Sequence, residues 1–176
     1  MLATHQAEQL KIQFEIEIDA PPAKVWEKMS SQDAMNAWLA RNLVFEHEVG
    51  GRFQMEGEMP GEGPYRFTGE VVKIVAEKEL AFTWKSELGE DGEWTEHTLV
   101  RFELEPTESG TRVTLTHSGF EVLGVALGKS AYEGHIQGWS AAQTMEGLKG
   151  AVDGSSMPES RYQALSGTTR RDILDG

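Results

Sequence analysis

The stretch LKIQFEIEI, residues 10–18, decides the fold because apolar and polar side chains alternate along it without a break. Alternation with a period of two is typical of a strand that buries one face. The apolar positions are Leu10, Ile12, Phe14, Ile16 and Ile18. Pro21 and Pro22 follow soon after, and proline belongs in the first turn of a helix. The sequence therefore predicts a strand that leads directly into a short helix.

A second short helix and six further strands are predicted beyond this point. Ser30 and Asp33 give the spacing S-x-x-D, which is typical of a helix start. The strands are expected at residues 43–49, 52–58, 65–75, 80–86, 94–104 and 111–117. Gly69 is expected to mark a bend or bulge in the third of these strands. Because short turns join consecutive strands, the pattern favours an antiparallel meander.

The last predicted element is a long helix over residues 130–152. It contains Gly134, Gly138 and Gly147, and each internal glycine costs about 1 kcal/mol relative to alanine. Such a helix needs tertiary packing, which the hollow of a curved sheet would supply. The predicted fold class is therefore α+β of the helix-grip kind. A curved antiparallel sheet of about seven strands, with two short helices after the first strand, would wrap around a long C-terminal helix.

Length and composition fit one globular domain. The chain has 176 residues, of which 39% are hydrophobic and 26% charged. We assign residues 1–152 to the domain. Residues 153–176 are rich in glycine, serine, threonine and charge, and we expect a polar tail with room for one short helix at 158–165.

Charge and residue content argue against several kinds of partner. The net charge of −13 disfavours binding to nucleic acids and to anionic membranes. Cysteine is absent, and the five histidines show no metal-ligand spacing, so we expect neither a metal nor a cofactor. No stretch resembles a signal peptide or approaches 18 apolar residues, which favours a cytoplasmic location.

Several segments, in their order along the chain, resemble one known family. They are IDAPPAKVWEKMS (18–30), Trp38, VGGRFQME (49–56), YRFTGEVVKI (65–74), LAFTW (80–84), TLVRFELEP (98–106), GTRVTLTHSGF (110–120) and GW (138–139). The chain resembles the START-like or SRPBCC superfamily over roughly residues 10–150. Within it, the sequence is similar to the family related to the C-terminal domain of the activator of the ninety-kilodalton heat-shock protein ATPase.

The resemblance implies a fold with an internal apolar cavity between sheet and helix. Some relatives in the superfamily bind lipids or polyketides, and others act as cyclases or aromatases. The heat-shock connection implies a possible chaperone partner and a role in the stress response. The full-length eukaryotic activator carries an additional N-terminal domain, which we expect this chain to lack.

Large apolar side chains on the predicted strands and the long helix are candidates for lining such a cavity. With two polar residues, the candidate ligand-binding set is Phe53, Met55, Tyr65, Phe67, Phe82, Trp84, Thr98, His117 and Trp139. Ligand sites are mostly apolar with a few placed polar groups, which this set would provide. The alternative is that these side chains, together with Phe102, simply fill the core.

His117, with Glu96 as its partner, is the candidate for a catalytic role. If Phe102 pairs with Val113, then Thr98 lies opposite His117 on the same face, with Glu96 next along it. These residues would hold the polar group of a ligand, or His117 and Glu96 would act as an acid–base pair. The alternative is a buried histidine that hydrogen-bonds a neighbour and closes the core.

Two other features, Trp38 and a glycine-containing segment at residues 124–130, are weaker candidates for a functional site. Trp38 would be either part of a gate over a cavity mouth or a packing anchor. The segment GVALGKS, residues 124–130, is one residue too short for a phosphate-binding loop.

Three functions remain open from the sequence. The first is a module that binds a small hydrophobic or amphipathic ligand without covalent chemistry, with His117, Glu96 and Tyr65 orienting its polar end. The second is a co-chaperone-like protein that docks on a heat-shock ATPase through a patch on the outer sheet face or its rim. The third is a cyclase, dehydratase or hydrolase that uses His117 as a general base.

Overall fold

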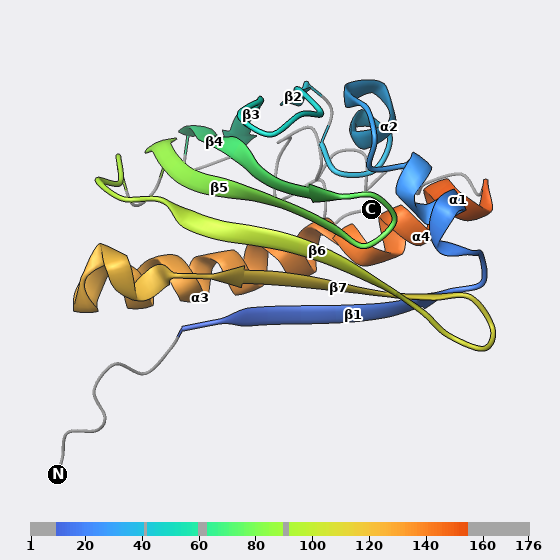
Figure 1. The fold of residues 1–176 in the computed structure, drawn as a ribbon. Coiled ribbons are helices and arrows are strands. Elements are labelled where there is room, and N and C mark those ends of the chain that lie inside the picture. Colours follow the sequence, from blue (N-terminus) through green and yellow to red (C-terminus); the bar gives the residue numbers. More distant parts are fainter. Residues whose placement is uncertain (1–9, 41, 60–62, 90–91, 155–176) are drawn as a thin grey trace, which may run out of the picture.

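One seven-stranded antiparallel sheet dominates the computed structural model, which describes residues 10–40, 42–59, 63–89 and 92–154 (Figure 1). The strand order is β1-β7-β6-β5-β4-β3-β2. The strands are β1 (Ile12–Ile18), β2 (Val44–Phe45), β3 (Arg52–Met59), β4 (Gly63–Val75), β5 (Glu79–Leu88), β6 (Thr98–Pro106) and β7 (Thr111–Ser118). Helices α3 (Val125–Ala142) and α4 (Thr144–Asp153) lie along one face, which we call the inner face. The predicted helix-grip architecture is confirmed.

The two predicted short helices follow β1. Helix α1 (Pro22–Glu27) begins after Pro21, as the paired prolines indicate. Helix α2 (Gln32–Asn36) begins one residue later than predicted, because the Ser31 side chain accepts the capping hydrogen bond from the Ala34 N–H at 3.1 Å. The Ser30 hydroxyl instead donates to the Trp26 carbonyl at 2.6 Å.

The prediction of an irregularity near Gly69 is confirmed. The pairing of β4 with β5 shifts between Arg66 and Phe67 and again between Val71 and Lys73, on either side of this glycine. A Cβ atom at position 69 would fall 1.7 Å from the Thr83 carbonyl oxygen. The two backbones approach so closely there that only glycine fits.

The predicted register of β6 against β7 is wrong by two residues. Phe102 lies opposite Leu115 rather than Val113, and Val100 lies opposite His117. The hairpin is longer than expected because β6 continues to Pro106, and Thr107 N–H closes the turn on the Gly110 carbonyl at 2.8 Å. A shift of two keeps each residue on its predicted face, so the inner row still contains the expected side chains. The predicted strand start at residue 94 is also wrong, since β6 begins at Thr98.

The predicted single helix over residues 130–152 is two helices. A 3-10 turn, η2 (Phe120–Leu123), and Gly124 with φ of +93° lead into α3 five residues earlier than expected. Gln143 then adopts a left-handed conformation, with φ of +50°, and separates α3 from α4. A left-handed residue ends a helix because it breaks the pattern of backbone hydrogen bonds. Helix α4 packs near β1 and α1 at the opposite end from η2 (Figure 1).

The boundary between domain and tail is only partly covered by the structure. Helix α4 ends at Asp153, and the expected short helix at 158–165 lies outside the described residues. No helix within the described ranges is long and apolar enough to cross a membrane.

Candidate functional site

His117 sits at the centre of a hydrogen-bonded network between the sheet and α3. Its side chain is 0% exposed. Its Nδ1 accepts a hydrogen bond from Trp139 Nε1 at 3.1 Å, and its Nε2 lies 2.8 Å from the Thr98 hydroxyl oxygen. That hydroxyl in turn donates to the Trp84 carbonyl at 2.9 Å. An indole N–H can only donate, so the proton of neutral His117 must sit on Nε2.

A second histidine completes what we call the histidine network, formed by Trp84, Thr98, His117, His135 and Trp139. Trp84 Nε1 donates to His135 Nε2 at 3.0 Å, so the His135 proton is on Nδ1, which lies 2.8 Å from the Ala131 carbonyl. The two imidazole rings are 5.1 Å apart. Burial, and secondarily the neighbouring His135, lowers the pKa of His117 well below its usual value. His117 is therefore held neutral.

This geometry does not bring together the predicted acid–base pair. Glu96 is exposed, in the loop before β6, whereas His117 is fully buried with both ring nitrogens engaged. The predicted polar cluster contains Thr98 and His117 but not Glu96. Within the described part of the chain, no three histidine, aspartate or glutamate side chains are placed to hold a metal ion. The hydrogen bonds of the network join α3 to the sheet.

One part of the candidate ligand-binding set is packed as core. Phe53 stacks on Phe82 with ring centroids 4.2 Å apart, and both side chains are fully buried. Phe102 is also fully buried and meets the edge of Trp38 at 5.7 Å. The Trp38 indole donates to the Lys28 carbonyl at 2.7 Å, which favours the packing anchor over the gate. Here the rings contact one another directly.

At the end where β3 meets β4, the side chains of the inner face are less buried than those of this core. Met55, Tyr65 and Phe67 point to the inner face but are only half-buried. Phe67 stacks on Trp84 at 4.6 Å and lies 5.7 Å from Tyr65. Burial raises the pKa of Tyr65 to about 12, so its phenol is neutral at physiological pH. We call the cluster of Met55, Tyr65, Phe67 and Trp94 the aromatic end.

Trp94 was missed as a site residue by the sequence analysis. Its backbone N–H donates to the Ser86 carbonyl at 2.8 Å, which ties Trp94 to β5. Its indole lies 5.4 Å from His135 and 6.4 Å from Phe67. The signal available in the sequence was the tryptophan itself, since its side chain buries a large apolar area and carries an N–H that usually has a partner when it is buried.

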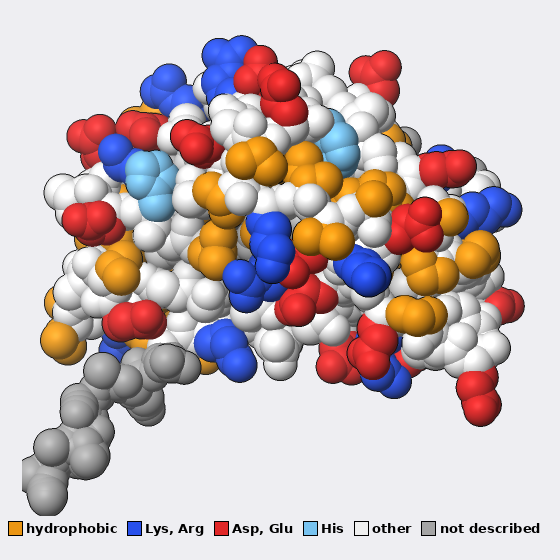
Figure 2. Space-filling view, in the orientation of Figure 1, with side chains coloured by type: hydrophobic (Ala, Val, Ile, Leu, Met, Phe, Trp, Pro, Cys, Tyr) orange, Lys and Arg blue, Asp and Glu red, His pale blue; other side chains and the backbone are white. Residues whose placement is uncertain are grey.

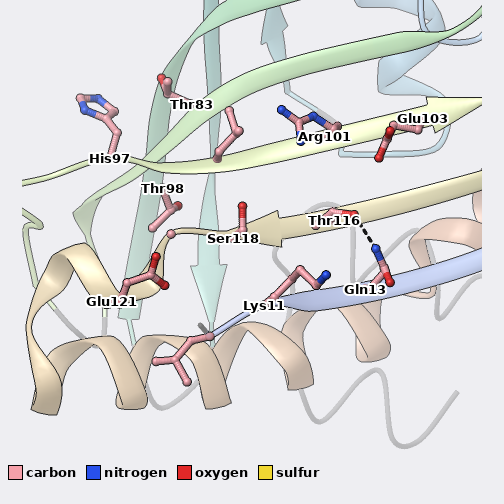
Figure 3. Close-up of a pocket in the computed structure, with 13 residues that line it drawn as sticks. Lys11, Gln13, Thr83, His97, Thr98, Arg101, Glu103, Thr116, Ser118 and Glu121 are labelled. Atoms are coloured by element: carbon pink, nitrogen blue, oxygen red, sulfur yellow. Dashed lines mark hydrogen bonds between the residues drawn. The ribbon is translucent and has the colours of Figure 1, made fainter. Parts of the chain in front are cut away.

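A polar groove of about 570 Å³ lies on the opposite, outer face of the sheet (Figure 3). We call it the outer groove. Its lining residues are Leu10, Lys11, Gln13, Thr83, His97, Thr98, Leu99, Arg101, Glu103, Thr116, Ser118, Gly119 and Glu121. Small side chains such as Thr116 and Ser118 form its floor, and longer charged ones such as Lys11, Glu103 and Glu121 surround it. Acidic and basic side chains are interspersed over the face seen in Figure 2.

An antiparallel sheet that holds a C-terminal helix across its inner face, with two short helices after the first strand, is the architecture of SRPBCC-type proteins. A family model described as "Activator of Hsp90 ATPase homolog 1-like protein" matches residues 19–153. The chain belongs to this family. The resemblance seen in the sequence is thereby confirmed.

Solved structures of bacterial proteins share the fold. The protein MLL2253 from Mesorhizobium loti is 26% identical, with a TM-score of 0.64 over 84% of this chain and 99% of that one. Mll3558 from Rhizobium loti is 21% identical, with a TM-score of 0.64 and the same coverage. The Aha1 dimer from Colwellia psychrerythraea is 22% identical, with a TM-score of 0.58 over 81% and 95% of the two chains. No curated protein matches the sequence.

Proposed function

We propose that the domain binds a small apolar or amphipathic molecule at the aromatic end, between the sheet and α3, without covalent chemistry. The observation that carries this proposal is the change of burial along the inner face. Phe53, Val71 and Phe82 are fully buried, whereas Met55, Tyr65 and Phe67 remain half-buried farther along the same strands. A ligand that covers these side chains would gain about 25 cal/mol for each Å² of apolar surface removed from water.

The proposal revises which residues orient the ligand. His117 and Glu96 were expected to hold its polar end together with Tyr65. Of these, Tyr65 alone lies at the aromatic end, where its neutral phenol can donate or accept a hydrogen bond. Met55 and Phe67 would supply apolar contact, and Trp84 would form the inner wall through its stacking on Phe67.

A screen of lipids and aromatic metabolites by native mass spectrometry and thermal shift tests this proposal. Binding should weaken by about tenfold in Phe67→Ala, which removes the central ring. Phe14→Ala is the matched control, because Phe14 is also half-buried but lies on β1, at the far edge of the sheet. Equal weakening in both variants, or no binder in the screen, would count against a site at the aromatic end.

A second candidate function, docking on a heat-shock ATPase, is favoured by the outer groove. We propose that the groove contacts the chaperone through Lys11, Arg101 and Glu121. Support comes from the family description, which refers to activation of the Hsp90 ATPase, and from a charged concave surface on the outer sheet face. The exposed Lys11 and Glu121 would set the partner's orientation through complementary charge.

Stimulation of the cognate ATPase, measured with the purified proteins, tests the docking proposal. Lys11→Glu and Glu121→Lys should each reduce the apparent affinity several-fold, and the loss should shrink at high salt. Lys24→Glu provides the control, since Lys24 is exposed on α1 and does not line the groove. If all three variants stimulate like the wild type, the groove is not the docking surface.

A further inference from the structure

The indole N–H of Trp94 is a buried donor without an acceptor. Trp94 is 1% exposed, and within the part of the chain that the structure describes its Nε1 has no hydrogen-bond partner. By contrast, Trp84, Trp139 and Trp38 all donate their indole N–H groups. A buried polar group left unpaired is costly, so native structures rarely retain one unless something else satisfies it. The position of this donor, in the aromatic end, suggests a ligand atom.

The neighbouring acceptors are already in use. His135, whose ring lies 5.4 Å from the Trp94 indole, accepts from Trp84 at Nε2 and carries its own proton on Nδ1. His117 accepts from Trp139. Among the residues that the structure describes, the Trp94 N–H thus has no acceptor, and a bound molecule would bring one.

The charge of the site limits the kind of acceptor. Met55, Tyr65, Phe67 and Trp94 include no cationic side chain, and the phenol of Tyr65 is neutral. Burial of an anion without a cation costs far more than burial of a neutral carbonyl that receives a hydrogen bond. The rings of Phe67 and Trp94, which meet edge to face with planes at 61°, would together offer an apolar surface to an aromatic or similarly flat body.

We infer that the ligand is an uncharged, mainly aromatic molecule with one hydrogen-bond acceptor, such as a ketone or ester carbonyl, which receives the N–H of Trp94. This inference rests on the proposed ligand-binding function and specifies its chemistry. Tyr65 is then available for a second polar atom or for apolar contact through its ring.

Two probe molecules that differ only in the hydrogen-bond acceptor measure how much the acceptor contributes to binding. 2-Acetylnaphthalene carries a carbonyl, and 2-isopropenylnaphthalene replaces it with a C=CH₂ group of the same shape. Titration calorimetry on the wild type should show the ketone bound about three to ten times more tightly than the hydrocarbon, as one neutral hydrogen bond implies. In Trp94→Phe the preference should fall to about one. The ratio within each variant cancels changes in ring size.

A spectroscopic readout on the wild type does not depend on any variant folding. The indole ¹⁵N–¹H signal of Trp94, assigned by its loss in Trp94→Phe, should move downfield with the ketone and much less with the hydrocarbon. If both probes bind equally to the wild type, or the ketone preference survives in Trp94→Phe, the inference is overturned while the ligand site stands. If neither probe binds, both the inference and the proposed site for aromatic ligands are wrong.

Discussion

Two adjoining clusters on the inner face of the sheet, the histidine network and the aromatic end, differ in how their buried hydrogen-bond donors are satisfied. At the histidine network, buried donors meet buried acceptors, from Trp139 through His117 to Thr98 and from Trp84 to His135. At the aromatic end, Trp94 is just as buried, but its indole N–H has no partner among the described residues, and nearby side chains remain half-buried. The comparison distinguishes a cluster whose buried donors are paired within the fold from a cluster in which one buried donor has no partner among the described residues. Burial and residue type alone would have pointed to His117 as the functional group.

The largest expected effect comes from removing Trp84, which belongs to the histidine network and stacks on Phe67 of the aromatic end. Its ring contacts Phe53, Phe67 and Trp139, and its N–H holds His135. Trp84→Ala should lower the free energy of unfolding by about 4 kcal/mol, measured by urea denaturation. Met55→Ala, at the half-buried aromatic end, should cost only about 1 kcal/mol because less surface is buried there. Equal losses of unfolding free energy in Trp84→Ala and Met55→Ala would mean that the two clusters do not differ in packing.

Alkaline pH should destabilise the protein through Tyr65. Its pKa in the folded state is about 12, above the usual value of 10, so the folded state holds this proton more tightly than the unfolded state. The resulting stability is fully present below pH 10 and is lost as pH rises through 12. Two pKa units correspond to about 2.7 kcal/mol. The free energy of unfolding of the wild type should therefore fall relative to that of Tyr65→Phe as pH rises from about 10 through about 12.

Absorbance at 295 nm measures the same group directly. Of the three tyrosines in the chain, one should ionise near pH 12 in the wild type, and this step should be missing in Tyr65→Phe. A Tyr65 that titrates near pH 10 would show that the aromatic end is more open to water than the structure indicates.

Matched tryptophan substitutions test the difference in hydrogen bonding. Trp139→Phe and Trp94→Phe both remove an indole N–H and shrink a ring. Only the first leaves an acceptor unpaired, at His117 Nδ1. Trp139→Phe should therefore cost about 1–3 kcal/mol more than Trp94→Phe in urea denaturation of the unliganded protein. Equal costs would indicate that the Trp139 hydrogen bond contributes nothing net.

The smallest effect at neutral pH concerns His117. Its pKa is lowered in the folded state, so the unfolded chain binds a proton first as the solution is acidified. The associated stability is present above pH 6.5 and is lost as pH falls below that value. Unfolding curves at pH 7.5 and 5.5 should show this loss in the wild type and a smaller one in His117→Gln. A histidine C2–H signal for His117 that titrates at pH 6.5 would contradict the closed network.

Much of the fold could be predicted because local patterns determine it. The alternation of residues 10–18 identified β1, and Pro21 with Pro22 identified the start of α1. The inner row of β6 and β7 was predicted correctly although its register was not, since a shift of two residues preserves the face. The break at Gln143 had no signal, because glutamine rarely adopts a left-handed conformation.

The site was harder to predict because it depends on how α3 lies over the sheet. The Thr98–His117 contact could be foreseen from neighbouring strands, but the height and rotation of the helix decide that Trp139 meets His117 and that His135 meets Trp84. Glu96 was placed wrongly because β6 begins two residues after it. Trp94 was assigned to a strand, although it lies in the segment before β6 and packs against Phe67 and His135.

The left-handed residue at Gln143 also has a mechanical consequence. A continuous helix of this length would behave as one rod, so lifting one end from the sheet would disturb the other. Here α3 contacts the aromatic end and α4 packs near β1, and a single pair of backbone torsions joins them. The covering layer thus consists of two segments held separately, α3 by the histidine network and α4 by its packing near β1, so that opening one segment need not disturb the other.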